Sequence, residues 1–563
     1  MRFHSFWPVV TLCAILLAGC SPGAQSRPQT DAAGADRSAQ PKRLVVGARE
    51  AAPVLSNQLD SNADVVQELV SAGLIRFTPR GEPIPLLAEA VPSLENDLWK
   101  AFPDGHMETT WKLREGLKWH DGRPLTTDDL LFAVRVGQDR ELPDFGHNAY
   151  RSLTGVRAVD ARTLIVEWKE PYIQADMMFS WEVALPLPKH LLEDAYLNAK
   201  EALTQHRYWS HEFVHAGPFM VREFVPTERL WLDAFPDFVS GRPKVDQVEV
   251  RFIPDVNTLI ANLIAGEVHF TIGPGIAVDQ AMQAQERWQE GKMANYPYQS
   301  TTTARPQFIN PDPPALLDLR FRRGLAHAIE KEALNETVTR GLAPTSGFIV
   351  PPGAPEFAAV TSSVVQYPYD PRRSAQLIEE AGYTRVGNTY RDASGKELSI
   401  EIQATQGDTG QEQAVLYIAD SWQRVGINGV PKLLAPEAAT REVRATRSAY
   451  EVGSHSAAMT QPRRLIWFHS GDIPRGENRF RGSNFTRYAN AELDALIDRF
   501  FLTVPPQERI ELFKQIAHHV TDQAVLISMY HTVHASLISN RVREVTPRTG
   551  HAQTWDAHKW DIS

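Results

Sequence analysis

The sequence predicts an α/β protein, because short apolar strands alternate with amphipathic helices along most of its length. One such unit consists of a strand at 245–254, a helix at 255–266 and a strand at 268–272. Asp255 is a suitable N-cap for this helix, and Gly266 suits its C-terminal end. A chain of 563 residues is too long for a single core, and a typical domain size of about 150 residues suggests roughly three or four domains.

Composition and charge exclude two classes of protein. Hydrophobic residues make up 43% of the chain and charged residues 22%, as in globular rather than disordered proteins. The net charge is −10 and the isoelectric point is about 6.0, whereas a nucleic-acid partner requires a basic stripe. We therefore expect a folded protein without a nucleic-acid partner.

The N-terminus carries the features of an export signal. Arg2 precedes an apolar stretch at 6–17, which is too short for a membrane-spanning helix. The sequence Leu17-Ala18-Gly19-Cys20 resembles the lipobox of bacterial lipoproteins, in which the cysteine is lipidated and becomes the first residue. We expect a signal peptide at 1–19 and a lipidated, flexible tether at 20–42. The alternative is an ordinary signal peptide that contains a cysteine by chance.

The cysteine count agrees with a lipid anchor. The chain has only Cys13 and Cys20, and Cys13 would leave with the signal peptide, so the mature protein would hold no disulfide bond. The tether is rich in small residues, proline and polar residues and cannot bury a core. No other stretch approaches the roughly 18 apolar residues of a transmembrane helix.

The segment 109–129, TTWKLREGLKWHDGRPLTTDD, contains two predicted strands and the start of a helix. Trp111 and Leu113 alternate with polar residues, and the alternation resumes at 117–119 after a turn. Thr126 begins a helix in which Asp129 completes a capping box. His120-Asp121 has the residue types of a general base and its orienting acid, but we interpret the pair as part of the scaffold.

A second segment, 211–215, has the sequence HEFVH of a zinc hydrolase motif. On a helix, His211 and His215 would lie on one face and bind zinc, with Glu212 as general base. Ala216-Gly217-Pro218 would end the helix at the second ligand, and no third ligand follows at a known spacing. The zinc hydrolase therefore remains the less favoured of the alternatives.

The second half of the chain continues the α/β pattern. Phe321, Leu325 and Ile329 share one helical stripe, and Gly341 and Pro344 end it. Further helices are predicted at 370–382, 490–501 and 510–520, and an apolar strand at 525–530. Other strands are predicted at 44–47, 160–168, 219–225 and 230–235, and other helical runs at 64–72 and 191–202.

Three segments carry a resemblance to a known family. Segment 109–129 matches the pattern W-K-L-R-x-G-x-K-F-H-D-G-x-P-x-T-x-x-D almost throughout. Segments 318–331 and 369–383 resemble D-x-R-x-R-x-A-L-x-x-A-I-D-R and Y-D-P-x-x-A-x-x-L-L-x-E-A-G-Y. All three patterns are typical of the bacterial extracellular solute-binding proteins of family 5, which serve dipeptide, oligopeptide and nickel ABC importers.

The resemblance implies a two-lobed periplasmic-binding-protein clamp of type II, cluster C, with an additional domain and mixed sheets flanked by helices. The implied ligand lies between the lobes, which close about a hinge. The expected divisions of the chain are a discontinuous lobe I at 43–90, 214–296 and 502–563, the additional domain II at 91–213 and lobe III at 297–501.

The resemblance also implies where a ligand binds. Glu50 and Asn57 follow the first strand, and Thr301 and Thr302 lie where the chain crosses between lobes. Peptide-binding members carry an aspartate for the peptide's ammonium group in a G-W-x-x-D-x-x-D-P stretch, but the equivalent segment 450–462 lacks it. That segment and the residues after it contribute the remaining candidates, His455, Met459, Arg463, Arg464 and Trp467.

We therefore predict a non-enzymatic solute-binding subunit of an ABC importer, without a cofactor or a catalytic residue. Its expected partners are a small-molecule or peptide ligand, a permease and an ATPase, and the membrane that holds its lipid anchor. The chain has no G-x-x-x-x-G-K-[ST] loop, so it is not the ATPase. We expect a monomer in the periplasm or at the cell surface. Peptide is the leading ligand class, and an anionic or metal-containing solute or a ligand-sensing role without transport are the alternatives.

Overall fold

The structure is a computed structural model that describes residues 41–456, 462–546 and 554–563, apart from the side chains of 296–299. Residues Pro41–Ser563 form one compact unit. Its main feature is a ten-stranded mixed sheet with the order β16-β15-β17-β12-β18-β11-β1-β10-β9-β8. These strands are β1 (Arg43–Ala48), β8 (Phe219–Val225), β9 (Arg229–Ala234), β10 (Gln247–Phe252), β11 (Phe270–Ile272), β12 (Gly291–Arg305), β15 (Ser399–Thr405), β16 (Asn428–Leu434), β17 (Tyr450–His455) and β18 (Ile527–Ser539).

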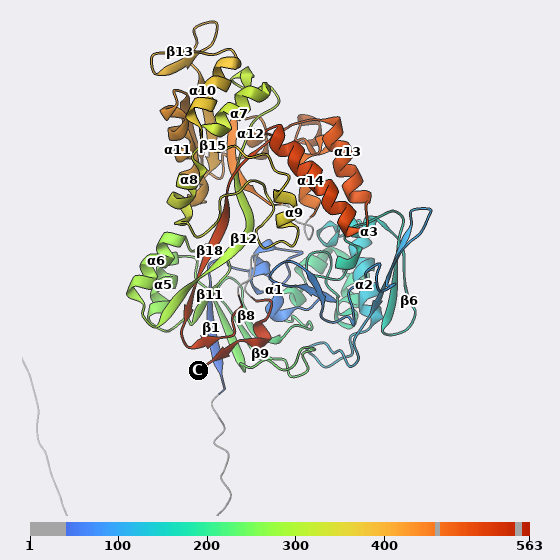
Figure 1. The fold of residues 1–563 in the computed structure, drawn as a ribbon. Coiled ribbons are helices and arrows are strands. Elements are labelled where there is room, and N and C mark those ends of the chain that lie inside the picture. Colours follow the sequence, from blue (N-terminus) through green and yellow to red (C-terminus); the bar gives the residue numbers. More distant parts are fainter. Residues whose placement is uncertain (1–40, 457–461, 547–553) are drawn as a thin grey trace, which may run out of the picture. The chain divides into compact units, whose positions relative to one another are not determined.

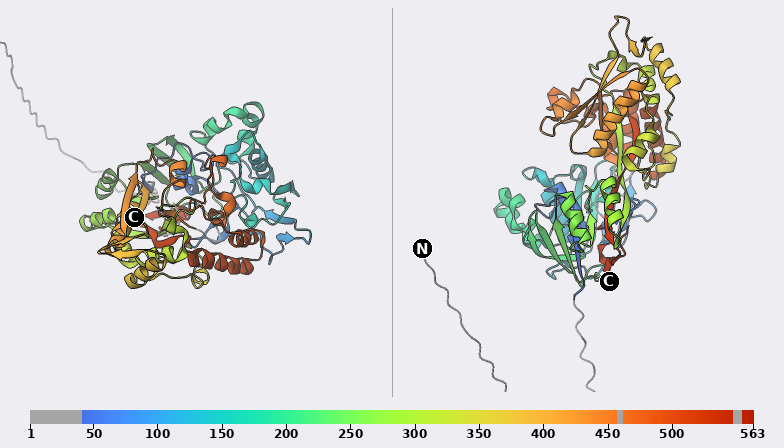
Figure 2. Two further views of the ribbon diagram at one scale, coloured as in Figure 1. Left: turned by 90° about the horizontal axis from the view of Figure 1, so that it is seen from above. Right: turned by 90° about the vertical axis from the view of Figure 1, so that its left-hand side faces the viewer.

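The two longest strands, β12 and β18, join two groups of shorter strands (Figures 1 and 2). They are antiparallel and pair from Gly291↔Ser539 to Ala304↔Ile527, with register shifts at Pro297/Thr301 and Thr302/Thr303. One edge of this pair continues into β11, β1, β10, β9 and β8, which we call the β1 half of the sheet. The other continues into β17, β15 and β16, which we call the β15 half.

The elements of the β1 half agree with the sequence predictions. The strands β1, β8, β9, β10 and β11 lie within one or two residues of the predicted ranges or inside them. Helix α5 (Val256–Ile264) begins at Asp255, whose carboxylate accepts the Thr258 amide hydrogen at 2.8 Å, and ends before Gly266, which has a φ of +78°. Helices α5 and α6 (Val278–Arg287) lie beside β11 and β18 (Figure 1). Leu259 and Leu263 of α5 pack with α6 against Val45 and Leu537 of the sheet.

The helices that flank the β15 half pack in two separate apolar clusters. The single helix predicted from Phe321 onward is two, α7 (Leu319–His327) and α8 (Lys331–Thr339), so that prediction was wrong about the continuity. Helix α10 (Pro371–Glu380) begins as predicted at Asp370, whose side chain accepts hydrogen bonds from two amides of the first turn. The predicted helices 490–501 and 510–520 are α13 (Ala491–Leu502) and α14 (Pro506–Asp522). The long helix α11 (Thr409–Arg424) was not predicted.

A separate four-stranded antiparallel sheet has the order β4-β5-β7-β6. Its strands are β4 (Trp99–Ala101), β5 (Met107–Lys112), β6 (Leu153–Ala158) and β7 (Thr163–Trp168), accompanied by α2 (Thr127–Gln138). The second predicted strand at 117–119 is absent, because this segment makes only an isolated bridge, Lys118↔Pro124. The chain turns back too soon there for a ladder to form.

Asp129 joins three parts of this region. Its buried carboxylate accepts hydrogen bonds from the Thr126 amide at 2.9 Å, the Lys189 amide at 3.0 Å and Trp119 Nε1 at 3.3 Å. The first of these bonds is the predicted capping interaction. Burial raises the pKa of Asp129 despite these donors. One carboxylate therefore fixes the start of α2, the 117–119 segment and the start of α4 (Lys189–Asn198).

The remaining elements are short. They are α1 (Asp64–Val70), α3 (Asn148–Arg151), α9 (Phe357–Thr361), α12 (Arg441–Ala445), β2 (Ile75–Phe77), β3 (Pro83–Pro85), β13 (Thr384–Val386), β14 (Thr389–Arg391), β19 (Val542–Arg543) and β20 (Asp561–Ile562). Within the described ranges, no helix combines the length and apolar character needed to cross a membrane.

The HEFVH segment forms no helix. His211 and Glu212 lie exposed in a turn, whereas His215 is buried and its Nδ1 accepts the Ala216 amide hydrogen at 2.9 Å. His120 contacts the same region, with its Nε2 3.0 Å from the Gly217 carbonyl oxygen. Asp121 contacts His190 at 2.7 Å and not His120. These side chains tie loops together in the manner of a scaffold.

Replacing Asp129 with alanine tests its structural role. Asp129→Ala leaves the buried Trp119 Nε1 and the partly buried Thr126 and Lys189 amides without their acceptor, and we expect the free energy of unfolding to fall by about 2–4 kcal/mol in urea titrations. Asp128→Ala is the matched control, because Asp128 is exposed and its contact with Lys189 Nζ is a surface ion pair. The control should cost about 1 kcal/mol or less. Equal losses in both variants would contradict the assigned role.

Candidate functional site

The strand directions place two sets of carboxyl ends opposite each other. β1 is parallel to β10 and β11, and β17 is parallel to β15, which is parallel to β16. β18 is antiparallel to both β11 and β12, and β12 is antiparallel to β17. β11 and β1 therefore run with β12 toward the β15 half, whereas β17 and β15 run back toward the β1 half. Ligands of α/β sheets bind outside the carboxyl ends of strands, so this junction is the candidate site.

Arg49 organises the wall formed by the β1 half. It follows β1 directly, and its Nε donates to the Pro254 carbonyl oxygen at 2.9 Å, while its Nη1 donates to the Gly275 carbonyl oxygen. Pro254 follows β10 and Gly275 follows β11, so one guanidinium joins the ends of three parallel strands. A Cβ on Gly275 would lie 2.9 Å from Arg49 Nη1, which explains why a glycine occupies this position.

Two acidic side chains lie beside this wall. Burial raises the pKa of Asp64 to about 6. The negative charge of Glu68 adds to this rise, whereas a hydrogen bond with Asn57 opposes it. Burial also raises the pKa of Glu50, and the charge of Asp64 adds to the effect. The predicted site residues Glu50 and Asn57 are thus linked through Asp64, which the sequence analysis missed. Its only sequence signal was its position at the start of a predicted helix.

Asn57 is itself fixed by two further contacts. Its amide donates to Gln67 Oε1 at 2.8 Å, and its Nδ2 donates to the Trp181 carbonyl oxygen at 3.2 Å. Because Gln67 belongs to α1, the loop after β1 is held against that helix. The wall after β1 therefore contains two carboxylates of raised proton affinity, those of Glu50 and Asp64. Such carboxylates favour the binding of a cationic group.

The predicted threonines are buried within the crossing strand β12. Thr301 Oγ1 lies 3.0 Å from His531 Nδ1, and Thr303 Oγ1 lies 3.1 Å from His455 Nδ1. Thr301 and Thr302 have exposed fractions of 0% and 1%. They therefore hold β12 against its neighbours rather than present a polar surface.

A buried cluster of charges lies at the amino end of β17, and its Arg305 reaches along the strand to within 3.4 Å of His455 Nε2. Arg305 Nη2 contacts Glu451 at 2.8 Å and Arg444 Nε contacts it at 2.6 Å. Arg447 donates to the carbonyl oxygens of Phe485 at 2.7 Å and of Arg305 at 2.9 Å. The three guanidinium groups outweigh burial and lower the pKa of Glu451. With three arginines around one carboxylate, the cluster carries a surplus of positive charge.

His455, the last residue of β17, is neutral above this cluster. Burial, followed by the charge of Arg305, holds its pKa well below the usual value. Its ring packs edge-on against Trp467 at 4.9 Å between centroids. Arg464 lies over the same Trp467 ring at 5.8 Å and donates to Ser456 Oγ. The structure thus brings His455, Arg464 and Trp467 together, whereas the predicted Met459 lies outside the described residues.

Arg463 faces the additional four-stranded region instead. It is exposed, and its charge adds to the burial that lowers the pKa of His147 to about 4, whereas at Tyr172 it opposes the burial that raises the pKa. Nearby, Ile173 is buried among side chains of α14 and of the 462–468 segment. Arg509 Nη1 of α14 donates to the Ile173 carbonyl oxygen at 3.3 Å. The 172–177 loop therefore makes a direct contact with the helices that flank the β15 half.

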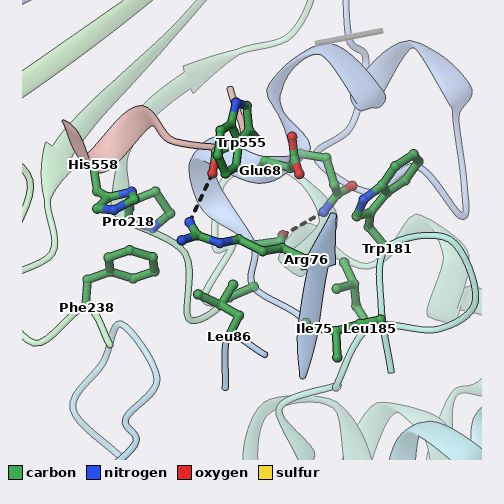
Figure 3. Close-up of a pocket in the computed structure, with 14 residues that line it drawn as sticks. Glu68, Ile75, Arg76, Leu86, Trp181, Leu185, Pro218, Phe238, Trp555 and His558 are labelled. Atoms are coloured by element: carbon green, nitrogen blue, oxygen red, sulfur yellow. Dashed lines mark hydrogen bonds between the residues drawn. The ribbon is translucent and has the colours of Figure 1, made fainter. Parts of the chain in front are cut away.

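Figure 3 shows a small cavity lined in part by residues near the C-terminus, which is a weaker candidate for the ligand-binding site. Its volume is about 20 Å³, which suits about one water molecule. Arg76 crosses it, with its guanidinium 5.4 Å from the Trp555 ring and its Nη1 donating to the Trp555 carbonyl oxygen at 3.2 Å. Glu68, Trp181 and His558 complete the wall (Figure 3). The cavity has the size of a structural water site.

Within the described ranges, no group of three or more His, Cys, Asp or Glu side chains is arranged so that it could hold a metal ion. The candidate site therefore consists of a wall with acidic groups after β1 and a wall with basic and aromatic groups after β17.

Comparison with a family model identifies a match over residues 82–466, more than half of the chain. The family is described as bacterial extracellular solute-binding proteins, family 5. It consists of substrate-binding proteins of ABC transporters.

Three relatives illustrate the range of the family. A Brucella ovis protein named for peptide binding in an ABC transporter is 27% identical over 316 residues, 55% of this chain and 56% of the relative. The oligopeptide-binding protein AppA of Bacillus subtilis is 24% identical over 501 residues, 87% of this chain and 86% of the relative. Heme-binding protein A of Haemophilus influenzae is 24% identical over 476 residues, 79% of this chain and 80% of the relative. The chain thus spans about half the length of the Brucella relative.

Solved structures share the fold. The oligopeptide-binding protein of Thermus thermophilus complexed with a pentapeptide has a TM-score of 0.69, with 21% identity over 93% of this chain and 96% of that one. NikZ of Campylobacter jejuni in complex with Ni(L-His) has a TM-score of 0.72, with 19% identity over 92% and 99%. The predicted fold, a type II periplasmic-binding-protein clamp with mixed sheets flanked by helices, is confirmed.

The raised pKa of Asp64 predicts a pH dependence of stability. Its folded value of about 6 exceeds the unfolded value, so the folded chain binds more protons between about pH 4 and pH 6. Asp64 therefore costs stability at pH 7, by about 3 kcal/mol if the shift is fully expressed, and this cost disappears as the pH falls toward 4. Asp64→Asn should be more stable than the parent chain at pH 7, with the difference shrinking toward pH 4.

Urea unfolding across pH 4–8 measures this effect. Asp97→Asn is the control, because it makes the same substitution at an exposed position. Parallel curves for the parent chain and Asp64→Asn would contradict the assignment of Asp64 as a destabilised carboxylate.

Proposed function

The chain belongs to the bacterial extracellular solute-binding proteins of family 5, and we propose that it is the solute-binding subunit of an ABC importer. It captures a small ligand between the two halves of its sheet and delivers it to a membrane permease that works with an ATPase. This proposal rests on the strand directions. The carboxyl ends of the parallel strands in the β1 half face the carboxyl ends of those in the β15 half, and β12 and β18 run between the two sets. A site built this way binds by closure rather than by covalent chemistry.

The hinge of this clamp is the β12–β18 pair. Its register shifts interrupt the ladder between Pro297 and Thr303, and such irregularities concentrate bending. Lobe I corresponds to the β1 half, domain II to the 91–213 region and lobe III to the β15 half. Helix α14 packs with α13 and α9 and therefore belongs to lobe III. We thus propose that the chain returns from lobe III to lobe I near Asp522, where α14 ends, rather than at residue 502.

Peptide is the leading ligand class. Relatives and structural neighbours include proteins named for oligopeptide, heme and nickel–histidine binding, so the family fold serves several ligand types. The ammonium-binding aspartate expected after β17 is absent, and the acidic groups Glu50 and Asp64 lie in the opposite wall. A peptide would then be held by its backbone and by its carboxylate near Arg464.

An anionic non-peptide ligand is the second candidate. Two observations favour it: Arg464 lies over Trp467 after β17, and Arg305, Arg444 and Arg447 form a surplus of positive charge around Glu451 at the other end of this strand. A carboxylate or phosphate group gains bidentate contacts from arginine that lysine does not provide.

The location of the protein follows from its N-terminus. We propose that residues 1–19 direct export, that Cys20 carries the lipid anchor, and that the protein acts as a monomer in the periplasm or at the cell surface. The proposal is supported by the Leu17–Cys20 sequence and by the extracellular family to which the chain belongs.

Native mass spectrometry of residues 41–563 tests the proposed function. The protein should carry a small adduct that is released on denaturation, because a closed cleft retains its ligand through purification. Adducts that sequence as peptides support the leading class, and one defined anionic compound supports the second. A protein that shows no adduct and binds neither peptide pools nor anionic metabolites would contradict the proposal.

Substitution of Arg464 tests the basic wall. Arg464→Gln removes one charge-assisted contact to an anionic group, so the affinity for the identified ligand should fall by about tenfold or more. Arg372→Gln is the control, since Arg372 is exposed on α10. Isothermal titration calorimetry measures both. An unchanged affinity in Arg464→Gln would place the ligand's anionic group elsewhere.

A further inference from the structure

The additional four-stranded region contains a cavity that lies outside the strand-end site. It has a volume of about 880 Å³ and lies between the C-terminal end of α2, the 143–146 turn and α3. Small-molecule sites in proteins have volumes of about 300–1,000 Å³. The cavity is therefore large enough for a compound of several heavy atoms rather than a single ion.

Two guanidinium groups in this cavity lack an acidic partner. Arg140 and Arg151 both line it, and in the described parts of the chain neither side chain has an ion pair or a hydrogen bond. The one acidic lining residue, Asp139, is already neutralised, with its carboxylate 2.8 Å from Lys200 Nζ and 2.9 Å from the Tyr196 hydroxyl. The lining thus carries two uncompensated positive charges.

The other polar groups of the cavity are also suited to an anion. His147 Nδ1 accepts the Ala149 amide hydrogen at 3.1 Å, which leaves Nε2 as the protonated donor of the neutral ring. Asn148 adds an amide donor to the same wall. Arg463 approaches from the β15 half, close enough for its charge to contribute to lowering the pKa of His147.

The remaining wall is aromatic and closely packed. Tyr150 lies against Gly137 of α2, where a Cβ would come within 2.1 Å of the tyrosine ring. The absence of a side chain at Gly137 lets the ring lie against the helix backbone. Gln138 Nε2 donates to the Tyr150 carbonyl oxygen at 3.3 Å and holds α3 in place.

A neighbouring cavity of about 440 Å³ shows what distinguishes this one. It shares Gln138 and Asp139, but its arginine, Arg135, lies 3.7 Å from Glu193 and is compensated. Its lining is otherwise largely apolar, with Leu131, Val134 and Val156. Unpaired positive charge therefore distinguishes the larger cavity from its neighbour.

We propose that the cavity between α2 and α3 is a second binding site, which takes a small soluble anion with two or more carboxylate or phosphate groups. Arg140 and Arg151 hold separate anionic groups of the ligand, and His147 and Asn148 donate hydrogen bonds to it. The site is independent of the ligand captured at the strand ends. Citrate and pyrophosphate represent the two sources of this chemistry.

Isothermal titration calorimetry of the purified full chain, in phosphate-free buffer of low ionic strength, tests the proposal. We expect one saturable site for citrate, pyrophosphate or both, which weakens as sodium chloride is added. Which anion binds identifies the chemical group. Absence of saturable binding for both anions would overturn the proposal.

Matched variants locate the site. Arg140→Gln with Arg151→Gln should weaken anion binding by about tenfold or more. Arg123→Gln with Lys112→Gln removes two exposed positive charges of the same region outside the cavity and should leave the affinity unchanged. Arg140→Lys with Arg151→Lys retains charge and should recover part of the binding, which separates charge loss from misfolding. Equal effects of the Gln variants inside and outside the cavity would overturn the proposal.

Discussion

The antiparallel pairing of β12 and β18 is the constraint on which the rest of the structure depends. This ladder joins the two halves of the sheet and fixes the directions of the strands on both sides. β11 is antiparallel to β18, and β17 is antiparallel to β12. Because β12 and β18 are themselves antiparallel, β11 and β17 run toward each other and their carboxyl ends face the same junction. Every feature of the candidate site follows from this arrangement, including the Arg49 contacts on one wall and His455 with Trp467 on the other.

The two walls differ in charge, and this difference has a physical origin. In the wall after β1, burial raises the proton affinity of Glu50 and Asp64. At the amino end of β17, three arginines surround Glu451, and their charges lower its pKa, while Arg464 adds a positive charge to the wall after β17. A ligand with a cationic and an anionic end would therefore have a preferred orientation between the walls. The 172–177 loop, through Ile173, connects the additional region to the basic wall.

Local patterns predicted local structure well. The Asp255 cap, the Thr126–Asp129 pair and Asp370 all begin helices as their sequences indicated, because capping depends on neighbours a few residues away. The break between α7 and α8 and the absence of a strand at 117–119 were not predicted, because apolar periodicity shows neither where a helix is interrupted nor whether a segment forms a ladder. The site was harder to predict. The pKa of Asp64 is set mainly by burial, which a local pattern does not show, and Arg305 meets Glu451 only through the pairing of strands distant in the chain.

The central claim is that the β12–β18 pair is a hinge that closes on a ligand. Cys13 and Cys20 both precede residue 41, so residues 41–563 contain no cysteine and a pair introduced at Val159 and Val386, both exposed, can carry spin labels. Double electron–electron resonance would measure the distance between the labels with and without the released ligand. If the hinge closes, the distance distribution becomes shorter and narrower when ligand is bound. Identical distributions in the two states would contradict hinge closure.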